Sequence, residues 1–133
     1  KYETALALMI FYDHWKSNFG DSNLKVKNAL ENIMITWGLE KRTLKKAYSI
    51  KGKKIKNPTI VGLTQGKSVV WVWRGKEYKI SRSSLAHELV HVSLRALNGH
   101  GDYDHEGPIK EGWTSEHTEL IIDVNRAIEA FGL

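Results

Sequence analysis

The feature that most constrains this chain is the pentapeptide His87-Glu88-Leu89-Val90-His91, which places two histidines four residues apart. Serines precede it and Asn98-Gly99 follows it, so the capping signals predict a helix over about residues 84–98. Apolar residues recur at helical spacing within this range and predict one buried face (Leu85, Ala86, Leu89, Val92 and Leu97). Because four residues make about one helical turn, both imidazoles are predicted to project from the same face.

Two imidazoles on one helical face are close enough to share one Zn²⁺. Glu88 lies one step round the same helix, where a carboxylate can take a proton from a metal-activated water. We therefore interpret His87 and His91 as zinc ligands and Glu88 as the catalytic general base. The alternative interpretation is a surface helix with two histidines and a solvated glutamate.

Residues 59–120 resemble the zincin superfamily of metallopeptidases, whose active-site helix carries the His-Glu-x-x-His motif. The resemblance is specific at the five motif positions, His87 to His91. It implies a zinc-dependent peptidase acting on a peptide or protein substrate, with Glu88 as general base and then proton donor to the leaving amine. It also implies a small sheet beside the motif helix, with an edge strand that holds an extended peptide.

A catalytic zinc takes a third protein ligand and leaves a further position open. His105 lies fourteen residues after His91, and a Gly-Pro pair follows one residue later. This arrangement is similar to that of SprT/Spartan-type proteases, in which a histidine before a Gly-Pro-containing turn completes a three-histidine site. We therefore name His105 as the third ligand. The metzincin arrangement is absent, because Leu94 and Leu97 occupy the places of its glycine and histidine.

Glu111 is the main competitor for the third ligand position. It lies twenty residues beyond His91, a separation similar to that of the glutamate ligand in thermolysin-like gluzincins. In that family the glutamate lies on a helix, whereas here Thr114 or Ser115 is the predicted cap of the next helix. Glu111 would then precede the helix. Three further residues stay open as alternatives: His100, Glu116 and His117.

The rest of the chain predicts an α+β fold around the motif helix. Three β-rich runs separated by turns predict a small antiparallel sheet of about three strands beside that helix (59–64, 68–73 and 77–80). Apolar spacing predicts two N-terminal helices and one C-terminal helix (2–19, from Asp21 or Ser22 to Trp37, and about 115–131). Together these elements predict one domain over residues 1–133, and the resemblance implies that it is a zincin-like metallopeptidase domain.

Composition limits the alternatives. The chain has 133 residues, of which 41% are hydrophobic, enough for a single core. It contains no run of about eighteen apolar residues, so no membrane span is predicted. The absence of cysteine leaves histidine and carboxylate as the metal ligands. The chain begins at Lys1 instead of Met, and we take this to favour a processed protein in an extracytoplasmic or secreted bacterial location.

Residues 41–56 form a basic segment without any acidic residue. It contains eight cationic side chains (Lys41, Arg42, Lys45, Lys46, Lys51, Lys53, Lys54 and Lys56). Such a run predicts contact with nucleic acid, anionic lipid headgroups or an acidic partner, or else a solvated basic surface. If the segment contacts DNA, the protein is a DNA-associated SprT-like protease that this segment guides to nucleic acid.

A further alternative to a peptidase is a zinc-containing binding module without catalysis.

Overall fold

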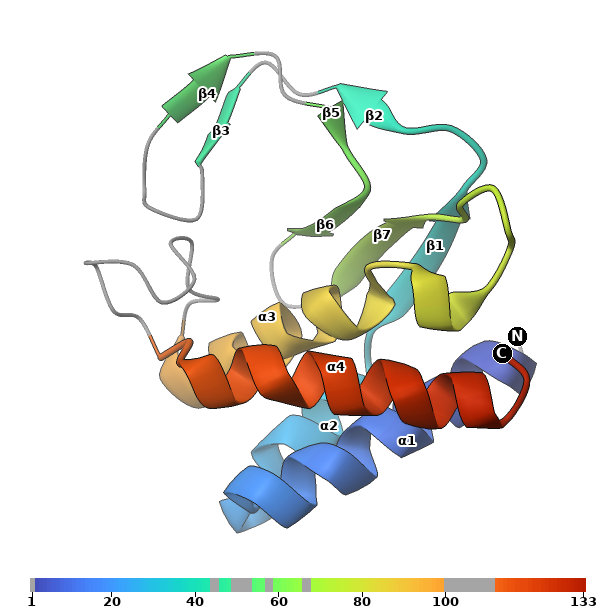
Figure 1. Cartoon of the computed structure of the whole chain (residues 1–133). Helices are drawn as coiled ribbons and strands as arrows, with labels where there is room; N and C mark the ends of the chain where they lie inside the picture. Colours follow the sequence, from blue (N-terminus) through green and yellow to red (C-terminus); the bar gives the residue numbers. More distant parts are fainter. Residues whose placement is uncertain (1, 44–45, 49–53, 57–58, 66–67, 100–111) are drawn as a thin grey trace.

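The computed structural model describes residues 2–43, 46–48, 54–56, 59–65, 68–99 and 112–133. Within these residues the fold is a mixed α+β arrangement of four α-helices, seven strands and two short 3-10 helices (Figure 1). The elements are α1 (Tyr2–Phe19), η1 (Ser22–Leu24), α2 (Lys25–Glu31), β1 (Met34–Gly38), β2 (Arg42–Thr43), β3 (Lys46–Tyr48), β4 (Lys54–Lys56), β5 (Thr59–Ile60), β6 (Gly62–Gln65), β7 (Val69–Trp73), η2 (Ile80–Arg82), α3 (Leu85–Asn98) and α4 (Ser115–Ala130).

The main sheet has three strands in the order β1-β7-β6. β1 runs parallel to β7, and β6 runs antiparallel to it, so the sheet is mixed and the prediction of an antiparallel sheet is wrong in this respect. Two small antiparallel pairs, β2 with β5 and β3 with β4, belong to the long connection between β1 and β7. In Figure 1 these pairs lie on the side of the sheet away from α1 and α2.

The predicted second helix is too long, because α2 ends at Glu31 and residues 34–38 form β1. Ile35, Thr36 and Trp37 are β-branched or aromatic and suit a strand as well as a helix. Pairing decides between the two: Thr36 lies opposite Trp71 and Trp37 opposite Val72 in the register with β7. This pairing joins residues 35 positions apart, so periodicity within a short window does not reveal it.

The predicted strand over residues 77–80 is also wrong. Gly75 (φ +80°) and Tyr78 (φ +55°) both have left-handed backbone, which bends the chain after β7, and the 3-10 helix η2 follows. The predicted strand over 59–64 is present but divided at Val61 into β5 and β6. The Val61 carbonyl accepts hydrogen bonds from the Trp73 backbone N–H (2.8 Å) and from the Ser84 hydroxyl (2.9 Å).

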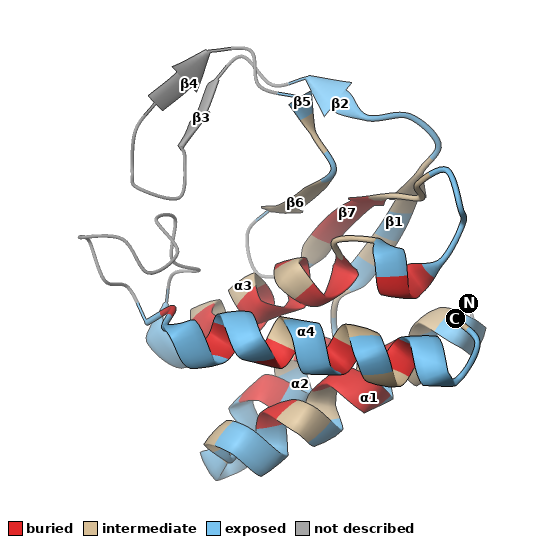
Figure 2. Cartoon of the chain, in the orientation of Figure 1, coloured by how far each residue is buried: buried red, intermediate tan, exposed pale blue. Residues whose placement is uncertain are grey.

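The motif helix α3 lies at the centre of the packing. It contacts β6 and β7 of the sheet, and it also packs against α2 and α4. Its buried apolar residues join those of β7 and the other helices in one core, and Figure 2 shows the buried positions on the facing sides of these elements. Each fully buried large apolar side chain contributes roughly 1.5–3 kcal/mol to the free energy of folding, and several such side chains of α3 fix this helix in the core. Among the described residues no helix combines the length and the apolarity that crossing a membrane requires.

Candidate metal centre

The predicted helix around the motif is confirmed as α3, Leu85–Asn98. Its first turn is held by Ser83, whose hydroxyl accepts from the Leu85 N–H (3.2 Å) and donates to the Ile80 carbonyl (2.7 Å). Ser84 occupies the N-cap position, but its hydroxyl donates to Val61 instead of capping the helix. Gly99 ends the helix with φ +84°, a left-handed conformation that favours glycine. The start of α3 is therefore tied to the strand segment beside it.

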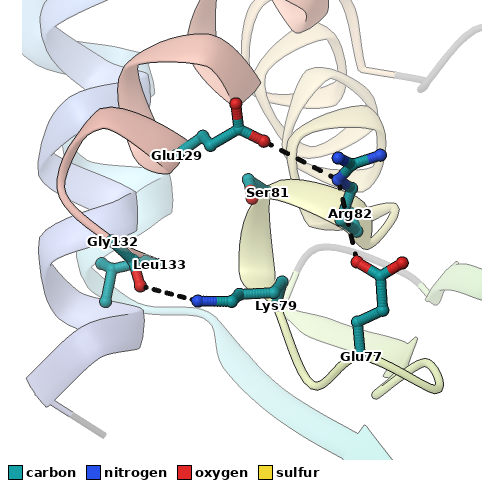
Figure 3. Close-up of a pocket in the computed structure, with 7 residues that line it drawn as sticks. All are labelled: Glu77, Lys79, Ser81, Arg82, Glu129, Gly132 and Leu133. Atoms are coloured by element: carbon teal, nitrogen blue, oxygen red, sulfur yellow. Dashed lines mark hydrogen bonds and ion pairs between the residues drawn. The ribbon is translucent and has the colours of Figure 1, made fainter.

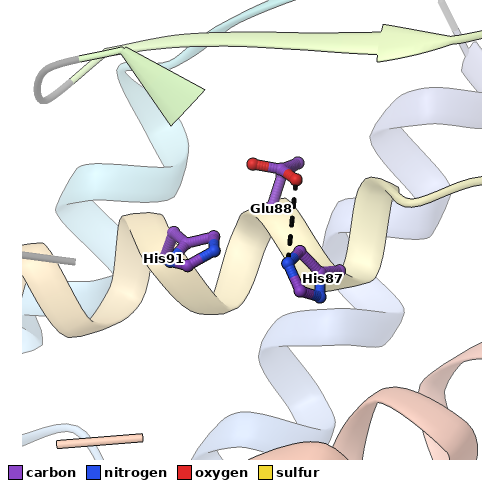
Figure 4. Close-up of side chains that lie close together, drawn as sticks. All are labelled: His87, Glu88 and His91. Carbon is purple, nitrogen blue, oxygen red and sulfur yellow. Dashed lines mark ion pairs between the residues drawn. The ribbon is translucent and has the colours of Figure 1, made fainter. Parts of the chain in front are cut away.

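His87, Glu88 and His91 converge as the motif predicts. One potential ligand atom from each lies within 4.8 Å of those from the other two, so this cluster could hold a metal ion. The two imidazole centroids are 5.0 Å apart with an interplanar angle of 74°, and His87 Nε2 lies 3.9 Å from Glu88 Oε2 (Figure 4). The two imidazole nitrogens fit Zn²⁺, which binds neutral histidine, and the Glu88 carboxylate lies beside them.

Glu88 is buried, with 5% of its surface exposed. Burial disfavours the charged carboxylate and raises its pKa to about 7, although a hydrogen bond from Thr64 acts in the opposite direction. In that bond, Thr64 Oγ1 on β6 donates to Glu88 Oε1 over 2.7 Å. A Cβ at Gly62 would meet both Ser84 Oγ and the Glu88 carboxylate, so a larger residue there would push β6 away from α3. Glu88 therefore has a fixed position and a pKa close to neutral.

Trp113 also belongs to this site, although sequence reasoning did not select it. Its ring centroid lies 5.0 Å from that of His87 and 5.0 Å from that of His91, and 4% of the residue is exposed. The indole Nε1 donates to Thr118 Oγ1 over 3.0 Å. The one available sequence signal was its place directly before the predicted helix cap, Thr114. Such a position does not by itself predict contact with the motif.

His117, an alternative third ligand, lies outside the cluster. Its ring stacks on Phe19 (centroids 4.4 Å apart, 11° between planes) and lies 5.4 Å from Trp15. Its Nδ1 accepts from the Thr114 backbone N–H over 3.0 Å, which completes the predicted cap of α4. Burial lowers the pKa of this imidazole, partly offset by the charge of Glu116. Glu116 is exposed and is likewise not part of the cluster.

The remaining third-ligand candidates, His100, His105 and Glu111, lie outside the described residues. The residues on either side of that segment are described. Gly99 directly follows α3, and a Cβ at Gly112 would meet the Asn98 side-chain amide. Both flanks therefore lie at the C-terminal end of the motif helix, and the assignment of His105 stays a prediction.

Two basic residues from the segment 41–56 have described side chains. Lys41 Nζ lies 4.7 Å from the ring centroid of Trp73, and the Arg42 guanidinium lies 5.1 Å from that of Trp71. These two cations contact the aromatic face of the sheet, in an arrangement worth roughly 0.5–1 kcal/mol at exposed sites. The anionic partner predicted for the segment stays a prediction.

Two cavities border the chain between β7 and η2 and share no residue with the histidine cluster. One of about 210 Å³ is lined by residues 73–79 and by Arg82. The other, of about 110 Å³, lies between this segment and the end of α4 (Figure 3). Arg82 lines the smaller cavity, and its Nε lies 3.9 Å from Glu77 Oε2 and 3.7 Å from Glu129 Oε2. All three side chains are well exposed, so these ion pairs add little to stability.

The chain matches no protein-family model, no curated protein and no solved structure. Any functional assignment therefore rests on the residues of the site and their arrangement.

Proposed function

We propose that this protein is a zinc-dependent peptidase with its active site on α3. The observation that supports this most directly is the convergence of His87, Glu88 and His91, with potential ligand atoms within 4.8 Å of one another on a buried helix. A solvated surface helix would leave the glutamate exposed, whereas Glu88 is 5% exposed and hydrogen-bonded to Thr64. Buried carboxylates with a raised pKa occur frequently at catalytic sites.

In this proposal the two histidines hold the metal through neutral imidazole nitrogens, and Glu88 moves the proton. Bound zinc would polarise the scissile carbonyl and lower the pKa of the attacking water. Glu88 accepts the proton of that water and then donates it to the leaving amine. Burial raises the pKa of Glu88 to about 7 in the metal-free chain, and the charge of a bound Zn²⁺ would lower it from there, which favours the carboxylate form that accepts the proton. Thr64 holds Oε1, while Oε2 lies toward His87.

We propose His105 as the third ligand, and the length of the chain is compatible with this. Gly99 lies eight residues after His91, a distance of about 12 Å along a helix. The six residues from Gly99 to His105 span up to about 20 Å when extended. Asp104 and Glu106 flank His105 in the sequence and would suit the orientation of a metal-bound imidazole. Glu111 competes for the same position.

We further propose that an extended peptide substrate pairs with β6. β6 is at the edge of the main sheet, and it carries Thr64, the hydrogen-bond partner of Glu88. A peptide added to a sheet edge gains main-chain hydrogen bonds without requiring a particular sequence. A substrate at this edge would lie next to the helix that carries the proposed base.

The substitution Glu88→Gln tests the peptidase proposal. It keeps the shape of the side chain but removes the base, so hydrolysis by the zinc-loaded protein should fall by at least about a hundredfold. The assay measures new amino groups released from an unfolded protein substrate such as casein, with zinc content determined in parallel. Glu116→Gln is the matched control, because Glu116 is exposed on α4, and it should retain the parental rate.

Two results would contradict the proposal. A Glu88→Gln variant that cleaves at the parental rate would exclude Glu88 as the base. A wild-type protein that binds zinc but cleaves no peptide bond would instead favour the zinc-containing binding module.

A further inference from the structure

Trp113 joins the C-terminal helix to the two histidines of the motif. Its indole is equidistant from the imidazoles, with ring centroids 5.0 Å from those of His87 and His91. The imidazole centroids are themselves 5.0 Å apart, so the three rings form a triangle with nearly equal sides. A single side chain from outside α3 therefore packs against both proposed ligands at once.

The indole is hydrogen-bonded to α4, the helix that follows Trp113 in the chain. Its backbone directly precedes Thr114, the N-cap of α4, and its Nε1 donates to Thr118 Oγ1 in the first turn of that helix (3.0 Å). With 4% of its surface exposed, Trp113 has little room to change rotamer. The ring thus has a fixed orientation relative to α4.

We propose that Trp113 is a positioning residue that orients His87 and His91 for metal binding. The inference rests on the metal centre of the proposed function, and not on peptide hydrolysis. A histidine on a helix retains freedom about two side-chain torsions, and a metal site binds more weakly when its ligands have to be ordered first. A buried ring packed against both imidazoles restricts these torsions before the metal arrives. Residues that orient metal ligands typically change metal affinity by about 10–100-fold when they are replaced.

The test measures the zinc dissociation constant of the whole chain by competition with a chelator. Trp113→Ala removes the ring, and its dissociation constant should rise by about 10–100-fold. Trp113→Phe keeps a smaller ring at the same position and should recover part of that loss. Trp15→Phe is the matched control, because Trp15 is fully buried but packs on Phe11, Phe19 and His117, away from the motif histidines.

Urea unfolding of the metal-free protein separates positioning from simple loss of packing. Both Trp→Phe variants should unfold at lower urea concentration, since each removes buried apolar surface. Only the Trp113 variants should lose zinc affinity, Trp113→Phe less than Trp113→Ala. The zinc affinity of Trp15→Phe should stay within about twofold of that of the wild type. If Trp113→Ala does not fold, Trp113→Phe compared with Trp15→Phe decides the question.

An unchanged or raised zinc affinity in the Trp113 variants would overturn the inference and leave the metal centre intact. Equal losses for Trp113→Phe and Trp15→Phe would also overturn it, because they would indicate a general effect of core packing. A wild-type protein without zinc affinity would overturn the metal centre and this inference together. A graded loss in a protein that cleaves no peptide would support the inference and contradict only the peptidase proposal.

Discussion

The histidine pair of α3 and the single histidine of α4 have similar aromatic surroundings but different bonding. His87 and His91 pack against Trp113, and His117 packs against Trp15 and Phe19. On α3, potential ligand atoms of the pair converge with Glu88. On α4, Nδ1 of His117 accepts from the Thr114 backbone N–H, and the ring stacks on Phe19 at 4.4 Å. Proximity to aromatic rings therefore does not mark a candidate metal ligand, whereas the convergence of potential ligand atoms does.

The spacing along each helix explains this difference. His87 and His91 are four residues apart in the first half of α3, so their side chains overlie one another on one face. His117 is three residues after the N-cap Thr114, the position from which a side chain reaches back to the backbone N–H of the cap. The same residue type thus serves as a candidate ligand in one helix and as part of a cap in the other.

The largest effect should come from removing the pair. The His87→Ala/His91→Ala double variant is expected to lose its bound zinc, because both proposed nitrogen ligands of the helix are gone. Elemental analysis of the purified folded protein measures this, and His117→Ala is the matched control, which should keep the zinc of the wild type. Undiminished zinc in a folded double variant would contradict the assignment. Loss of zinc in His117→Ala would contradict the distinction between proposed ligands on α3 and a capping histidine on α4.

The next effect concerns the third ligand. His105→Ala should weaken zinc binding by at least about a hundredfold, more than is usual for residues that only orient a ligand, while Glu111→Ala should stay within about twofold. Titration of each metal-free variant with zinc gives the two affinities. The reverse result would exclude a three-histidine site and place the centre with the gluzincins, whose third ligand is a glutamate.

The helices α1, α3 and α4 were predictable from the sequence because their signals are local, whereas the predicted second helix ran into β1. Serines before α3, glycine after it and Thr114 before α4 mark ends that agree with the structure within one or two residues. The convergence of His87, Glu88 and His91 follows from the same regular geometry, since it requires only that the motif be helical. Sequence reasoning succeeded where a single element determines the outcome.

The sheet and the surroundings of the motif were not predictable because they depend on contacts between distant residues. β1 is a strand because it pairs with β7, and the Thr64 hydroxyl reaches Glu88 from 24 positions away. Trp113 lies 22 positions beyond His91 and reaches both histidines only because α4 packs on α3. No pattern within a short stretch of sequence predicts such a contact between distant residues. The polar partner of Glu88 and the aromatic neighbour of His87 and His91 were therefore missed.

The smallest expected effect is the pH dependence of the stability that His117 contributes. Burial lowers the pKa of this imidazole below its ordinary value of 6.5, so the unfolded chain binds a proton at His117 more readily than the folded chain does. The stability that His117 contributes is therefore fully present above about pH 6.5 and is lost as the pH falls through the window between 6.5 and the lower folded value. His117→Phe keeps a ring that can stack on Phe19 but cannot be protonated.

Urea unfolding of metal-free wild type and His117→Phe at pH 7.5 and pH 5.5 measures this contribution. At pH 7.5 the variant should be less stable by about 1 kcal/mol, because the hydrogen bond from the Thr114 N–H is lost. At pH 5.5 this deficit should shrink, because only the wild type then loses stability through protonation of His117. The difference between the two proteins cancels the contributions of His87, His91 and Glu88, which both chains share. A deficit that is equal at both pH values would mean that His117 titrates alike in the folded and unfolded chain, and its burial would then have no electrostatic consequence.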